Sequence, residues 1–200
     1  MNTGLHLYQK KARFRQRLHY QRPFKDHFRW RAVMQGSDTL NGDFDLELFQ
    51  AELLWQIRNS SDHGWDSAIR FDTRVSKDGM NPDRIGVNWS NQFNFANRWQ
   101  ARAIFLTARE IGKRKRSGVL IRTWTQIRYR LQNDSTVALE PFNTYGRTPS
   151  FGSFQRQKHQ IGAAYSGRFS NGLNYNLGIL FGISDAATNM DLRFFLSKFF

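Results

Sequence analysis

The chain has 200 residues, no cysteine and a formal net charge of +14. The lack of cysteine excludes disulfides, thiol catalysis and cysteine-ligated metals, and no apolar run is long enough for a membrane-spanning helix. Mean hydropathy is only -0.64 although 15% of the residues are aromatic. A transmembrane β-barrel is compatible with both values, because only alternate residues of each strand face lipid.

Apolar and polar residues alternate with a period of two along most of the chain, which predicts strands with one apolar face. The predicted strands span residues 11–21, 28–35, 44–57, 65–76, 84–95, 99–110, 119–131, 136–145, 156–169, 173–184 and 190–200. Near Leu48 the apolar positions change from even to odd numbers, which predicts a β-bulge. Phe105 has apolar neighbours on both sides, so the facing of its strand is ambiguous. Pro141 makes 136–145 the least secure strand.

The last predicted strand ends the chain on an aromatic residue. Its apolar face carries Met190, Leu192, Phe194, Leu196 and Phe200. This strand resembles the terminal strand of bacterial outer-membrane β-barrels, although Lys198 departs from that pattern. The resemblance implies recognition by the barrel-assembly machinery through Leu192, Phe194, Leu196 and Phe200, and residence in the bacterial outer membrane. The stretch from Asp43 onward, with FDLELFQAELLWQI and LEPFNTYG, also resembles small proteobacterial outer-membrane proteins with no assigned activity.

The connections support a barrel independently, because short turns alternate with longer loops. The predicted periplasmic turns are 96–98, 133–135 and 170–172, and the predicted outer loops are 77–83, 111–118 and 147–154. Eleven strands is an odd number, so we expect a twelfth, either at Thr3–Gln9 or upstream of Met1 together with a signal peptide that the first residues lack. The sequence therefore predicts one all-β domain over 1–200, an antiparallel up-and-down transmembrane β-barrel of about 12 strands.

If the apolar face meets lipid, arginines dominate the inner face. The predicted anion-binding residues of the lumen are Arg13, Arg15, Arg17, Arg29, Arg31, Arg70, Arg74, Arg102, Arg122, Arg128 and Arg130. Few carboxylates oppose them, and a guanidinium keeps its charge and binds carboxylate, sulfate or phosphate with two hydrogen bonds. The pattern is similar in architecture and charge to the oligogalacturonate and sialic-acid channels. It favours a porin-like channel for small anions or acidic oligosaccharides.

Two other functions are compatible with parts of this pattern. Small barrels often fill their interior with ionic networks, so a closed structural or assembly barrel without transport is the first alternative. The second is a soluble basic β protein that binds nucleic acid. The aromatic residues lie opposite the arginines, whereas a stacking platform needs both on one surface. We therefore expect outer-membrane lipid and lipopolysaccharide, the latter at Lys113–Arg116, as partners rather than nucleic acid.

No catalytic or metal-binding constellation is recognisable, and no cofactor is expected. The Ser-Asn-Gly at Ser170–Gly172 superficially resembles that of the outer-membrane phospholipase, but Arg168 stands where that family needs a histidine. A hairpin turn is the more economical interpretation. The five histidines, His6, His19, His27, His63 and His159, are scattered and show no metal-ligand or triad spacing. The sequence therefore predicts no enzyme.

Overall fold

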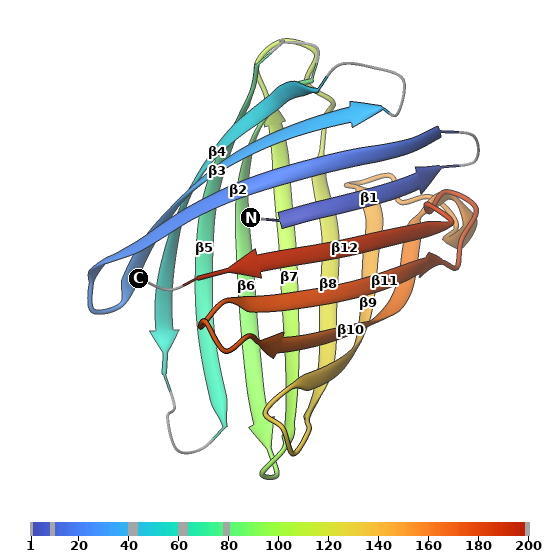
Figure 1. The fold of residues 1–200 in the computed structure, drawn as a ribbon. Helices are drawn as coiled ribbons and strands as arrows, with labels where there is room; N and C mark the ends of the chain where they lie inside the picture. The colour runs from blue at the N-terminus through green and yellow to red at the C-terminus, as the bar shows by residue number, and fades with distance from the viewer. Residues whose placement is uncertain (1, 9–10, 40–43, 60–63, 78–80, 199–200) are drawn as a thin grey trace.

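Strands of the described chain pair with their neighbours in sequence, and β1 pairs with β12, so that the sheet closes into an antiparallel barrel (Figure 1). This computed structural model describes residues 2–8, 11–39, 44–59, 64–77 and 81–198. The strands are β1 (Asn2–Tyr8), β2 (Lys11–Lys25), β3 (Phe28–Thr39), β4 (Asp45–Arg58), β5 (Trp65–Ser76), β6 (Asp83–Phe95), β7 (Trp99–Ile111), β8 (Val119–Arg130), β9 (Thr136–Arg147), β10 (Lys158–Arg168), β11 (Asn174–Gly182) and β12 (Met190–Ser197). The predicted all-β, up-and-down architecture is confirmed.

The twelfth strand lies within the chain, so the count of eleven strands needs correction. β1 pairs with β12 from Asn2 opposite Phe195 to Leu7 opposite Met190, and with β2 on its other side. The strand therefore corresponds to the Thr3–Gln9 alternative, and no missing upstream strand is needed to close the sheet. Its sequence signal is weak because only Leu5 and Leu7 alternate with polar residues.

The apolar face of the strands points outward. Leu53, Phe71 and Val87 expose more than a third of their surface, while polar neighbours such as Glu52 and Asn88 are buried. Phe105 is exposed on β7 and Ala108 is buried, which resolves the ambiguous facing of that strand. An apolar band around the outside of a barrel is the surface that a transmembrane β-barrel presents to lipid.

A ring of aromatic side chains marks one end of this band. Rings on neighbouring strands contact one another in pairs, among them Tyr20 with Trp30, Phe28 with Trp55, Trp65 with Phe93, Trp99 with both Phe95 and Tyr129, and Tyr165 with Tyr175. All lie toward the end of the barrel where β2, β4, β6, β8 and β10 turn back, here called the turn end. Such girdles lie at the membrane–water interface, where rings bury their apolar bodies.

The two local irregularities expected from the sequence have separate outcomes. The bulge near Leu48 is confirmed, because Gln35 pairs with Leu48 and Gly36 with Leu46, leaving Glu47 as the extra residue. Pro141 lies inside β9 and pairs with Ile161 of β10. On its other side, Phe142 pairs with Trp124 of β8 and Leu139 pairs with Ile127, but Pro141 pairs with no residue of β8. The proline, which has no N–H, thus lies where the ladder with β8 is interrupted.

The connections at the opposite end, here called the loop end, are longer and partly tied together. The predicted turns at 96–98, 133–135 and 170–172 are all at the turn end. At the loop end, the β9–β10 connection contains a short 3₁₀ turn, η1 (Phe154–Arg156). Its Gln155 backbone oxygen accepts a hydrogen bond from Ala186 N at 3.0 Å. No helix of the described residues is long and apolar enough to span a membrane.

The depth of the outward residues in the membrane can be tested by introducing a charge at two positions. Ile179 lies four residues from the girdle residue Tyr175, or about 10 Å along the membrane normal at 3.4 Å per residue and a 40° tilt. We expect Ile179→Arg to destabilise the folded barrel by about 2–4 kcal/mol. Ile127 lies only two residues from Tyr129, so Ile127→Arg should destabilise the folded barrel by only about 0–1 kcal/mol. Denaturant unfolding in lipid vesicles measures both, and an equal cost at the two positions would contradict the assigned depth.

Candidate anion-binding lumen

The predicted arginines are not equivalent in the structure. Eight of them are half-buried on the inner face of the barrel: Arg15, Arg17, Arg31, Arg70, Arg74, Arg102, Arg122 and Arg128. Arg29 and Arg130 are more exposed and lie toward the turn end of β3 and β8. The side chain of Arg13 lies outside the described residues. The strand period brings these groups to one face, but register decides what each one meets.

One group of arginines is neutralised by a buried carboxylate. Glu52 accepts a hydrogen bond from Arg31 Nε at 2.7 Å and lies 3.6 Å from Arg70 Nη1. Arg70 Nε lies 3.9 Å from Asp72. Arg31 and Glu52 are opposite each other on β3 and β4, and Glu52 is opposite Asp72 on β5. The charges of Arg31 and Arg70 are therefore largely balanced within the wall.

A second group carries excess positive charge. We call Arg17, Arg74, Arg84 and Arg122 the arginine cluster. Arg74 and Arg84 are directly opposite each other on β5 and β6, and the charge of Arg122 acts on Arg74. The Nε atoms of all four are buried and have no hydrogen-bond partner in the part of the chain that the structure describes. Among the described residues, Arg74 and Arg122 form no ion pair, and Asp72 is the acid that acts on both.

Glu110 organises the loop end of the inner face. Its carboxylate is fully buried and lies 3.3 Å from Arg84 Nη2 and 2.8 Å from Arg116 Nη2, and it also pairs with Arg147. Its Oε2 accepts a further hydrogen bond from the backbone N–H of Arg116 at 2.9 Å. The hydrogen bond to Glu110 raises the pKa of Arg116, which lies in the β7–β8 loop. One carboxylate thus ties β6, the β7–β8 loop and β9 together.

The rest of the inner face mixes charge with neutral and aromatic surface. Arg102 donates two hydrogen bonds to Gln92 Oε1, at 3.2 and 2.6 Å, so its partner is neutral. Trp124 and Phe142 stack across β8 and β9 with ring centroids 5.2 Å apart. The Arg193 guanidinium lies 4.1 Å from the Phe142 centroid. Nearer the turn end, a cavity of about 490 Å³ is lined by Arg29, Arg31, Arg70 and Arg102 together with Asp66 and neutral residues.

Several of these residues were absent from the predicted site. Arg84 and Arg193 alternate with the outward residues Ile85 and Leu192, so strict use of the two-residue period would have assigned them to the inner face. Trp124 and Phe142 are aromatic, and the assumption that aromatic residues face lipid hid them. Glu110 has no local signal at all, because its partners come from β6, a loop and β9.

Ser170 and His159 lie far apart in the structure, at opposite ends of β10. Ser170 lies in a hairpin turn closed by a hydrogen bond from Phe169 N to Leu173 O at 2.9 Å. His159 is the second residue of β10, whereas Ser170 follows the end of that strand. Both nitrogens of its ring are engaged, Nδ1 by Asn143 at 2.8 Å and Nε2 by Gln157 at 2.9 Å. Within the described residues, no three His, Asp or Glu side chains group as metal ligands.

Comparisons with known proteins give a fold but no sequence family. No family model matches the chain, and no curated protein matches it in sequence. Among solved structures, the KdgM porin superposes with a TM-score of 0.70 at 9% identity, over 100% of this chain and 98% of that one. The KdgM porin in complex with disordered oligogalacturonate gives 0.70 at 10%, over 100% and 98%. A NanC porin structure gives 0.69 at 12%, with the same coverage. The fold is that of these porins.

Proposed function

We propose that this protein is a porin-like channel of the bacterial outer membrane, whose arginine-rich lumen passes or binds small anions or acidic oligosaccharides. The observation that carries the proposal is the arginine cluster. Arg17, Arg74 and Arg122 have buried Nε donors without partners and no ion pair among the described residues. Guanidinium groups keep their charge at any physiological pH. A confined passage with such an excess concentrates anions and repels cations.

The fold supports the same proposal. The barrel superposes over almost its whole length on porins, one of them bound to oligogalacturonate. That ligand is a polyanion, and its carboxylates are the groups that a guanidinium binds with two parallel hydrogen bonds. The mixed inner surface around Trp124, Phe142 and Arg193 adds apolar area suited to a sugar ring. An acidic sugar is therefore the substrate class that we infer for this lumen.

A closed structural barrel is the second candidate, and one observation favours it. Glu52 and Glu110 each bind more than one arginine and link neighbouring strands. Such networks hold a barrel wall together without any transport. They leave Arg74 and Arg122 without a carboxylate partner among the described residues, which a purely structural network would not require.

A planar-bilayer recording of the unmodified protein separates these functions. A channel should show open conductance, with a reversal potential in a potassium chloride gradient that favours chloride. The preference should shrink as salt rises from about 0.1 to 1 M, because the Debye length falls from about 10 to about 3 Å. Conductance without anion preference would contradict the acidic substrate, and no conductance would support the structural barrel.

A further inference from the structure

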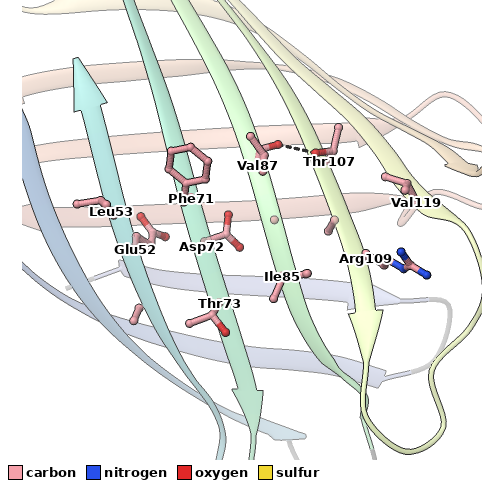
Figure 2. A pocket seen from close by; sticks show the side chains of 13 residues that line it. Glu52, Leu53, Phe71, Asp72, Thr73, Ile85, Val87, Thr107, Arg109 and Val119 are labelled. Carbon is pink, nitrogen blue, oxygen red and sulfur yellow. Dashed lines mark hydrogen bonds between the residues drawn. The ribbon is translucent and has the colours of Figure 1, made fainter. Parts of the chain in front are cut away.

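A groove crosses the outer face of the barrel over β4 to β8 (Figure 2). It has a volume of about 620 Å³. Strand pairing sets Ala51, Thr73, Ile85, Arg109 and Val119 side by side in one row across five strands. Large side chains such as Phe49 and Trp89 are exposed on the same outer face of β4 and β6. The small side chains of Ala51, Thr73 and Thr107 therefore leave a hollow in a surface that is otherwise covered by large apolar groups.

A cation closes one end of the groove. Arg109 faces outward, because Phe105 and Ile111, at the same parity on β7, are exposed while Ala108 and Glu110 are buried. Figure 2 shows its guanidinium on the Val119 side of β7, away from Ile85. Arg109 forms no hydrogen bond or ion pair with any residue that the structure describes. An unpaired charge on a lipid-facing wall is costly unless it reaches a polar partner.

The depth of Arg109 indicates where that partner lies. Arg109 is ten residues from the girdle residue Trp99 on the same strand, which at 3.4 Å per residue and a 40° tilt is about 26 Å. The apolar band of such barrels is about 25 Å tall. The guanidinium therefore lies at the opposite interface, at the level of lipid headgroups, with the groove running inward beneath it.

The adjacent loop adds positive charge above this position. Residues 112–118 contain four basic and no acidic residues. Arg116 turns to Glu110, while Lys113, Arg114 and Lys115 are exposed. The nearest acid on the outer row is Asp83, opposite Ile111, and its carboxylate accepts a hydrogen bond from Ser76 N at 2.9 Å. At the loop end of this wall, Arg109 on β7 is thus followed by three exposed cations in the loop, Lys113, Arg114 and Lys115.

We propose that this groove and Arg109 bind one lipopolysaccharide molecule of the outer leaflet. An acyl chain fills the hollow between Ala51 and Thr107, one lipid A phosphate binds Arg109, and the second meets Lys113 and Arg114. Arginine binds phosphate through two charge-assisted hydrogen bonds. A second copy of this chain fits poorly, because a two-fold contact at this face would bring like charges together. The site rests on the outer-membrane location proposed above and not on conductance.

Native mass spectrometry of the folded protein with bisphosphorylated lipid A tests the site. We expect one lipid A to remain bound per chain, and Arg109→Gln to weaken binding about tenfold, as expected for a hydrogen bond to a charged group. The matched control is Arg98→Gln, which removes the same charge from the turn before β7 and should bind as the unmodified protein does. Ala51→Phe fills the groove without changing charge and should also weaken binding. Heat-modifiability on gels confirms that each variant is folded.

Four results would overturn the proposal: equal loss in Arg98→Gln, unchanged binding by Ala51→Phe, equal retention of dephosphorylated lipid A, or equal retention of phosphatidylglycerol. A dimer that Arg109→Gln dissociates would assign the face to a second copy instead. If Arg109→Gln fails to fold, Arg109→Lys and Ala51→Phe still decide the matter. Binding is measured on the folded protein, so the test gives a result whether or not the barrel conducts ions.

Discussion

Replacing Arg17, Arg74 and Arg122 together by glutamine is expected to abolish most of the chloride preference of the channel. These three members of the arginine cluster form no ion pair among the described residues, so their removal leaves the carboxylates of the wall satisfied. A unit charge about 7 Å from a permeating ion contributes about 0.6 kcal/mol in water. Allowing for screening, three such charges predict a fall in the chloride-to-potassium permeability ratio of about tenfold at 0.1 M salt.

The matched control removes three charges from outside the lumen. Arg22, Lys25 and Arg98 are exposed and lie toward the turn end, so their glutamine variant has the same net charge as the lumen variant. Reversal potentials of both variants, recorded at 0.1 and 1 M salt, measure the effect. If the control loses as much selectivity as the lumen variant, the total charge of the protein controls permeation and the arginine cluster does not.

The second large effect concerns the stability of the barrel. Glu110→Gln should cost about 3 kcal/mol, because it leaves buried guanidinium groups without the acid that they share. We expect the lower end of the range for broken buried pairs, since Arg116 keeps 66% of its side chain in solvent while Arg84 and Arg147 keep 21% and 16%. Equilibrium unfolding by denaturant in lipid vesicles measures this free energy.

A carboxylate outside any network provides the comparison for Glu110. Asp134 lies in the exposed β8–β9 turn with φ of +59°, a conformation that asparagine tolerates. Asp134→Asn should therefore change stability by less than about 0.5 kcal/mol. Combining Glu110→Gln with Arg147→Gln should cost less than the sum of the two single changes, because the pair shares one interaction. Additive costs would show that Glu110 and Arg147 do not interact.

Local sequence was sufficient for most of the wall. The strand over Trp65–Ser76 has the predicted bounds, and the bulge opposite Gln35 follows from the change of apolar phase near Leu48. Both depend on the two-residue period, which links each side chain to one face without reference to the rest of the chain. Ser170 likewise lies in the hairpin turn that its Asn-Gly neighbours indicate. The same period places Arg31, Arg74 and Arg122 on the face opposite the apolar band.

Alternation within single strands therefore predicts the barrel class, the facing of most strands and the basic character of the inner face. No local pattern predicts that β1 closes the sheet, that Glu52 neutralises Arg31 and Arg70, or that Glu110 binds Arg84, Arg116 and Arg147. The carboxylate contacts join residues 6 to 37 positions apart, and the closure pairs the first strand with the last. Their partners are set by strand register and barrel closure, which bring distant segments together and leave Arg74 and Arg122 without an ion pair among the described residues.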